Sequence, residues 1–154
     1  MVKKIEIKPL SNYEIFNYAT NKNLKIYCIP KDQLANHKLL KNKQSIVINL
    51  DDSDGSGTHW LALIKKNNQL FYYDPFGVEH IDPEILNFIK KHKNNKAFLS
   101  KEQNQNITSV KCGYYCLACI NSIIGKADMS FQDYMDVLHD EPSKFNEYII
   151  FTML

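Results

Sequence analysis

Two apolar runs separated by a pair of asparagines form the clearest pattern along the chain. Residues 58–77 read THWLALIKKNNQLFYYDPFG, and the runs on both sides of Asn67-Asn68 are rich in strand-forming side chains. Two polar residues between such runs are typical of a two-residue hairpin turn. The pattern therefore predicts an antiparallel hairpin in which directly opposed residues have numbers that add up to 135.

The remaining apolar runs are bounded by turn and capping residues. Strands are expected at 24–29, 45–50 and 96–100, and helices at 11–19, 82–93, 112–124, 130–139 and 143–154. Ser11, with Glu14 three residues later, is typical of a helix start. Asp82 before Pro83 is another such start, and Gly125 is a typical helix end. Strands in the middle and helices toward both ends predict an α+β fold, with a small central sheet, mixed or antiparallel, flanked by helices.

Composition favours one globular domain over residues 1–154. Of the 154 residues, 44% are hydrophobic, and neither a repeat nor a shift in composition marks a boundary. The beginning, MVKKIEIKPLSNYE, lacks the apolar segment of a secretory signal, and no apolar run approaches the roughly 18 residues of a membrane span. We therefore expect an intracellular protein, without membrane association, in which thiols stay reduced.

The charge pattern gives little support to nucleic-acid binding. The 19 basic residues are all lysines, and they are scattered along a chain of net charge +2. Without arginine the bidentate contacts to phosphates and bases are missing. Most of these lysines are expected to lie on a solvated surface.

Three of the four cysteines, Cys112, Cys116 and Cys119, lie within eight residues. Their spacing matches the iron–sulfur motif of radical-SAM enzymes, but those enzymes need a large barrel after the motif, and only 35 residues follow Cys119. A zinc site would need further paired cysteines or histidines, which the chain lacks. No metal and no cofactor are therefore expected. Cys116 and Cys119 are interpreted as core residues of a helix.

Cys112 differs from the other two by its position at the expected start of the helix. Free backbone N–H groups there favour a thiolate. In the predicted hairpin, His59 and Asp74 share a face as diagonal neighbours, with backbones about 7–8 Å apart. We expect the helix 112–124 to cover that face, which would give Cys112 a histidine base and an orienting carboxylate. The other histidines, in polar or loop-like surroundings without a comparable carboxylate, are His37, His80, His92 and His139.

These motifs together resemble a family of viral proteases. GTHW (57–60), YYDPFG (72–77), a glutamine-containing loop and CGYYC (112–116) are similar to the adenain-like maturation proteases of adenoviruses, virophages and Polinton/Maverick elements. SUMO-deconjugating proteases are more distant members of the same clan. The resemblance covers residues 10–125 and implies the fold of that clan, with the nucleophile at the start of a buried helix.

The resemblance also implies roles for individual residues. It makes His59, Asp74 and Cys112 the catalytic triad, and Gln105, seven residues before the cysteine, the oxyanion-hole glutamine. Gln103 is the neighbour that could take its place. As substrate-binding residues it implies Trp60, as the wall of a narrow subsite, and Gly113.

The function that the resemblance implies is cleavage of viral capsid or core precursor polypeptides after small, glycine-containing sites during particle maturation. Such an enzyme acts in the virion and in the host-cell cytoplasm. Adenain is activated by a disulfide-linked peptide and by DNA. Here no cysteine lies between Cys28 and Cys112 to form that disulfide, and the net charge of +2 gives DNA only weak support as a partner. The sequence leaves open an activating peptide that binds without a disulfide.

Three other functions are compatible with the same residues. A deconjugating protease for ubiquitin-like modifiers would keep the site and change the substrate. An acetyltransferase, as in certain bacterial effectors, would keep the fold and change the reaction. A metal-binding or capsid-scaffolding module would leave Cys112 inert.

Overall fold

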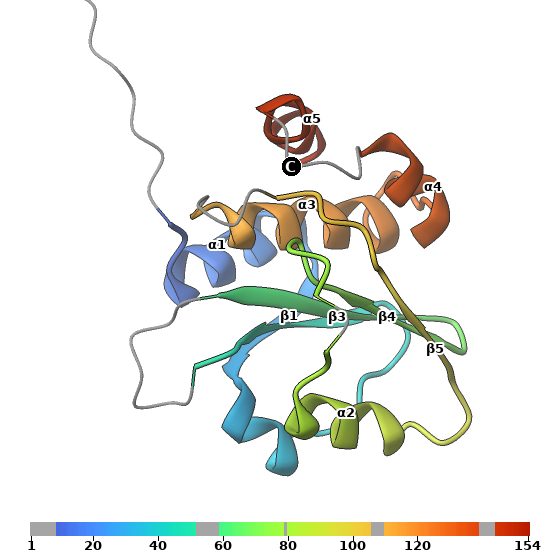
Figure 1. Cartoon of the computed structure of the whole chain (residues 1–154). Coiled ribbons are helices and arrows are strands. Elements are labelled where there is room, and N and C mark those ends of the chain that lie inside the picture. Colours follow the sequence, from blue (N-terminus) through green and yellow to red (C-terminus); the bar gives the residue numbers. More distant parts are fainter. Residues whose placement is uncertain (1–8, 52–58, 79, 106–109, 139–143) are drawn as a thin grey trace, which may run out of the picture.

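A five-stranded sheet lies between two layers of helices in the computed structural model, which describes residues 9–51, 59–78, 80–105, 110–138 and 144–154 (Figure 1). In chain order, which is also their order in the sheet, the strands are β1 (Lys25–Pro30), β2 (Gln44–Asn49), β3 (Trp60–Lys66), β4 (Gln69–Tyr73) and β5 (Lys96–Leu99). The helices are α1 (Asn12–Lys22), the 3₁₀ helix η1 (Lys31–Asn36), α2 (Pro83–Lys90), α3 (Cys112–Ile124), α4 (Phe131–Val137) and α5 (Lys144–Met153). The expected α+β fold is confirmed.

The sheet is mixed, and its central hairpin has the predicted register. β1 runs parallel to β2 and β4 runs parallel to β5, whereas β3 is antiparallel to both β2 and β4. In the hairpin Leu63 lies opposite Tyr72, and Lys66 lies opposite Gln69, so both pairs add up to 135. Asn67, in the turn, has a φ of 55°, a left-handed conformation that asparagine adopts more readily than most residues.

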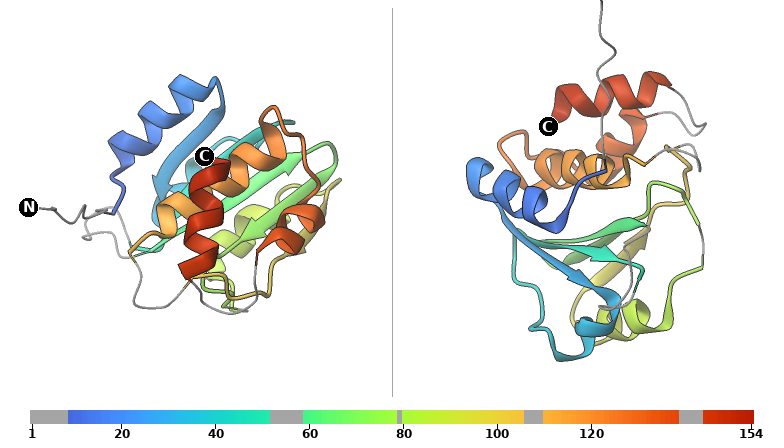
Figure 2. Two further views of the ribbon diagram at one scale, coloured as in Figure 1. Left: turned by 90° about the horizontal axis from the view of Figure 1, so that it is seen from above. Right: turned by 90° about the vertical axis from the view of Figure 1, so that its left-hand side faces the viewer.

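Each face of the sheet has its own apolar core. One face packs against α1, α3 and α4, with α5 lying on the outer side of α3, and α2 and η1 cover the other face (Figures 1 and 2). The hairpin contributes Ala62, Ile64, Phe71 and Tyr73 to the first core and Leu61, Leu63, Leu70 and Tyr72 to the second. Burying one large apolar side chain contributes roughly 1.5–3 kcal/mol, so both cores hold the hairpin firmly in the centre of the protein.

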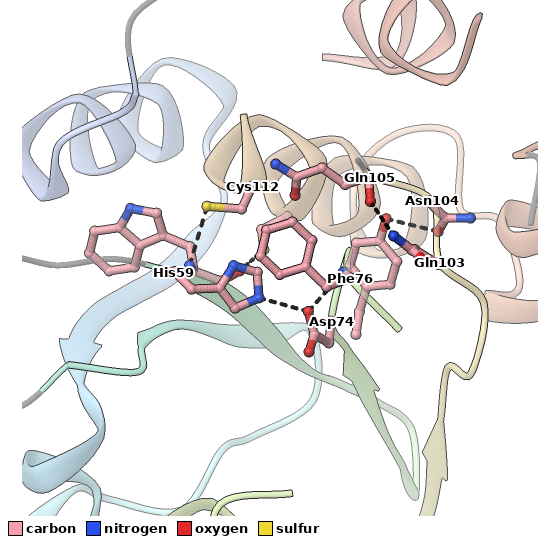
Figure 3. A network of polar contacts seen from close by, with 10 residues as sticks. His59, Asp74, Phe76, Gln103, Asn104, Gln105 and Cys112 are labelled. Atoms are coloured by element: carbon pink, nitrogen blue, oxygen red, sulfur yellow. Dashed lines mark hydrogen bonds and ion pairs between the residues drawn. The ribbon is translucent and has the colours of Figure 1, made fainter. Parts of the chain in front are cut away.

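The expectation that the helix 112–124 covers the face carrying His59 is wrong. Helix α3 packs against the face of Ala62 and Ile64, whereas α2 lies over the face of Leu61 and Leu63. Both faces of the hairpin are apolar, so alternation alone could not tell which of them α3 would cover. His59 nevertheless reaches the helix, because it precedes β3 by one residue and lies at the end of the sheet, beside the first turn of α3 (Figure 3).

Most helix boundaries follow the capping residues in the sequence. At the start of α1, the Glu14 N–H donates to Ser11 Oγ at 3.2 Å, and the Ser11 N–H donates to Glu14 Oε1 at 3.3 Å. Asp82 caps α2 by accepting from the Glu84 N–H at 3.1 Å. Helix η1 was not predicted, and α4 is shorter than expected, with His139 outside the described residues. In the described part of the chain, no helix is both long and apolar enough to cross a lipid bilayer.

Candidate active site

His59 and Asp74 meet at the end of the central hairpin. His59 Nε2 lies 2.7 Å from Asp74 Oδ1, and both residues are buried, with exposed fractions of 7% and 3% (Figure 3). The Leu50 N–H donates to the His59 carbonyl at 3.0 Å, which holds this part of the chain beside the end of β2. The predicted same-face pair therefore forms a hydrogen bond between side chains.

The turn that follows β4 fixes the orientation of both groups. The Phe76 N–H donates to Asp74 Oδ1 at 2.9 Å, and the Gly77 N–H donates to the Asp74 carbonyl at the same distance. The Phe76 ring stacks on the His59 imidazole, with ring centroids 4.1 Å apart and planes 11° apart. Phe76 therefore orients both groups: its backbone N–H binds the Asp74 carboxylate, and its ring packs on the His59 imidazole. Phe76 was not among the site residues predicted from the sequence, although it lies in the YYDPFG motif.

Cys112 is the first residue of α3, and its thiol lies beside His59. The Trp60 N–H donates to Cys112 Sγ at 3.3 Å, so the residue after the histidine positions the sulfur. A Cβ on Gly113 would lie 3.2 Å from Leu10 Cβ and 3.5 Å from Trp60 Cδ1, so a larger residue at this position would require Leu10 to shift. The two residues proposed to bind substrate, Trp60 and Gly113, are therefore close neighbours of the thiol.

The electrostatics of the site favour a protonated imidazole. Burial by itself lowers the pKa of His59, because the charged ring loses its solvation. The hydrogen bonds to Asp74 and Cys112, with the negative charges of these groups, outweigh burial and raise the pKa of His59 from 6.5 to about 9. His59 Nδ1 has no nitrogen or oxygen partner among the described residues, which leaves it for the thiol. The ring lies between the sulfur and the carboxylate (Figure 3).

The glutamine loop approaches the thiol from the other side. The side chain of Gln105 is buried and extends toward Cys112, whereas the Gln103 amide donates to the Gln105 carbonyl at 3.2 Å (Figure 3). The structure thus places Gln105, rather than Gln103, beside the sulfur. Gly77, with a φ of 67°, allows this approach, since a Cβ there would lie 2.7 Å from the Gln103 backbone nitrogen.

The other cysteines are core residues. Cys116 and Cys119 have no exposed surface, and burial raises the pKa of both thiols well above the usual range. The Cys116 thiol lies 3.5 Å from the Trp60 carbonyl oxygen, to which it donates. All four cysteines are free thiols, and no group of three or more metal-ligating side chains occurs among the described residues.

His92 differs from the sequence-based expectation, which placed it in polar or loop-like surroundings. It is buried, Nε2 accepts from the Leu40 N–H at 2.9 Å, and Nδ1 lies 3.0 Å from the Phe88 carbonyl oxygen. Burial lowers the pKa of His92. These two backbone contacts give His92 a structural role, because they tie the end of α2 to the segment before β2.

No protein-family model and no curated protein sequence matches the chain. A solved crystal structure, that of the ASFV pS273R protease, has a similar fold, with a TM-score of 0.61 and 16% sequence identity. The match covers 92% of this chain and 65% of the protease, so the chain spans about two thirds of the length of that protein. At this identity the likeness concerns the fold, and the chain therefore has the α+β fold of the ASFV pS273R protease, a five-stranded mixed sheet between two helical layers.

Proposed function

We propose that the chain is a cysteine endopeptidase of the adenain-like type, with Cys112 as nucleophile, His59 as base and Asp74 as the orienting acid. The observation that carries this proposal is the imidazole held at 2.7 Å by a buried carboxylate, with its other nitrogen left for the thiol at the start of α3. A thiol, an imidazole and a carboxylate in this order form the arrangement that activates a nucleophile. The fold shared with a protease adds support.

The geometry suggests how the reaction begins. Asp74 accepts from Nε2 of His59, which leaves Nδ1 to take the thiol proton. The pKa of His59, about 9, allows the ring to hold a second proton at neutral pH. His59 therefore either takes the thiol proton as the sulfur attacks or holds an ion pair with a thiolate. The thiolate sulfur then forms a bond to the carbonyl carbon of the substrate.

Stabilising the resulting oxyanion is the role proposed for Gln105. Its side-chain amide and the Cys112 backbone N–H would both donate to the negative oxygen, and losing one such donor typically costs about 10²–10³ in rate. His59 then gives its proton to the departing amine, and the C–N bond breaks. Water hydrolyses the acyl-enzyme in a second half-reaction, with His59 again as the base.

The proposed substrates are capsid or core precursor polypeptides of a virus, virophage or related element, cut after small, glycine-containing sequences. Trp60, whose N–H contacts Cys112 Sγ, is proposed as the wall of a narrow subsite, which would suit residues with small side chains. The proposed sites of action are the virion and the host-cell cytoplasm, and an activating peptide or DNA is a candidate partner.

The test is to incubate the purified chain with the structural proteins encoded beside it and to map the new N-termini. Cys112→Ala should abolish processing, and Cys116→Ala, which changes a cysteine one helical turn away, should leave it intact. Processing that persists in Cys112→Ala would overturn the proposal. Faster cleavage of a diglycine-terminated ubiquitin-like protein would instead indicate a deconjugating enzyme, and acetyl-CoA-dependent labelling of a target an acetyltransferase.

A further inference from the structure

Asn104, the residue before Gln105, is fixed by three separate parts of the fold. Its backbone N–H donates to the Pro75 carbonyl at 3.0 Å, and its side-chain oxygen, labelled in Figure 3, accepts from the Tyr73 hydroxyl at 3.1 Å. Its carbonyl accepts from the Asn146 amide at 3.0 Å. Asn104, Asn146 and Tyr73 have no exposed surface. Strand β4, the turn after it and helix α5 thus converge on one buried residue.

A buried asparagine destabilises the folded protein unless its polar atoms have hydrogen-bond partners. Burying an amide away from water is unfavourable when its hydrogen bonds are not replaced, and a network with fixed partners holds its backbone in one position. Gln105 is fixed in the same way, since its N–H donates to the Pro75 carbonyl at 2.9 Å. The backbone from which the Gln105 side chain extends toward Cys112 therefore has very little freedom.

Helix α5 makes a second contact on the other flank of the site. Glu147, the neighbour of Asn146, pairs with Lys111 at 2.7 Å, and Lys111 immediately precedes Cys112. Two consecutive residues of α5 thus hold the residue before the glutamine and the residue before the nucleophile. Figure 2 shows α5 crossing over α3 on the side away from the sheet.

We propose that α5 acts as a clamp that sets the position of Gln105 relative to Cys112, with Asn104, Asn146 and Tyr73 as positioning residues. This inference rests on the proposed function, because it concerns where the oxyanion forms. The hydrogen bonds described above join these three residues to one another and to Pro75, and not to the thiol or the imidazole. Their effect is expected in the steps that need an oxyanion donor, and not in the reactivity of the thiol itself.

The test compares Asn146→Leu and Tyr73→Phe with a matched control, Ser122→Ala. Ser122 is buried, and its hydroxyl donates to the Ala118 carbonyl at 2.7 Å, a bond that stays within α3 and lies far along the helix from the nucleophile. Each protein is assayed for hydrolysis of a glycine-containing fluorogenic peptide and for acylation by p-nitrophenyl acetate. Alkylation of Cys112 by iodoacetamide, which forms no oxyanion, is measured alongside.

The first two variants should lower kcat for the peptide and the rate of acylation by about tenfold or more, with KM and the alkylation rate changed less than about threefold. The control should keep all of these values within about threefold. Unchanged turnover in both folded variants would overturn the clamp, and so would an equal loss of alkylation. If Asn146→Leu does not fold, Tyr73→Phe, which removes a single hydroxyl, decides the question alone. Absence of hydrolysis and acylation in the wild-type chain would instead overturn the proposed function, and the clamp with it.

Discussion

Replacing Asp74 by Asn tests whether the carboxylate keeps a proton on His59. In the folded protein the pKa of His59 is about 9, against 6.5 for the free side chain. A group whose pKa is raised by folding stabilises the folded state fully below its unfolded pKa, and this contribution is lost as the pH rises through the folded pKa. The stabilisation by His59 is therefore expected to be complete below pH 6.5 and to have largely disappeared at pH 9.

The magnitude follows from the size of the shift. The difference 9 − 6.5 is 2.5 pH units, and each unit corresponds to about 1.4 kcal/mol, so His59 contributes roughly 3 kcal/mol to the free energy of unfolding at low pH. In Asp74→Asn the ring stays buried but loses the neighbouring charge, so its pKa falls. The stability advantage of the wild type over the variant should therefore shrink by up to about 3 kcal/mol between pH 6 and pH 9.

Urea denaturation followed by circular dichroism, at intervals of about half a pH unit, measures this difference. The wild type and Asp74→Asn both contain His92 and the buried cysteines, so the contributions of these groups cancel in the difference between the two free energies of unfolding. Asp82→Asn is the matched control: it removes a carboxylate that caps α2 and pairs with Lys31, and its effect should stay constant across the same range. If the curves of the wild type and Asp74→Asn run parallel from pH 6 to pH 9, the proposed pairing of His59 is wrong.

Two further predictions concern the turn after β4. Gly77→Ala should lower kcat by about 10²–10³, because a Cβ at a φ of 67° would lie 2.7 Å from the Gln103 backbone nitrogen and displace the glutamine loop. Steady-state kinetics measure this loss, and full turnover in a folded variant would contradict the prediction. Phe76→Leu removes the ring stacked on His59, and since such a contact is worth about 0.5–1.5 kcal/mol, kcat should fall by up to about tenfold. A change in KM alone would refute that expectation.

Local signals in the sequence were sufficient for most of the fold. The pair Asn67-Asn68 sets the register of the central hairpin, and this register alone places His59 and Asp74 within reach of each other. Ser11 and Asp82 mark two helix starts because their side chains accept hydrogen bonds from backbone N–H groups of the first turn. These features depend on neighbours in the chain, so a single sequence reveals them.

Features that depend on distant contacts were missed. Nothing local tells which apolar face of the hairpin α3 covers, and nothing near His92 shows that Leu40 will donate to it. Which of Gln103 and Gln105 lies beside the thiol likewise depends on a distant contact. The Pro75 carbonyl accepts from the Gln105 N–H and so fixes the glutamine loop. The four proposed catalytic residues were named from the sequence and lie together in the structure, and their roles stay a prediction.

The order of elements along the polypeptide has a consequence for synthesis. His59, Asp74, Gln105 and Cys112 all leave the ribosome before α5 does, so a nascent chain can display the thiol and its base while Asn104 still lacks the amide of Asn146. Helix α5 also supplies Ile150 to the core around α3. Under the proposed function and the proposed clamp, a growing chain would turn over substrate less efficiently until this late helix has docked.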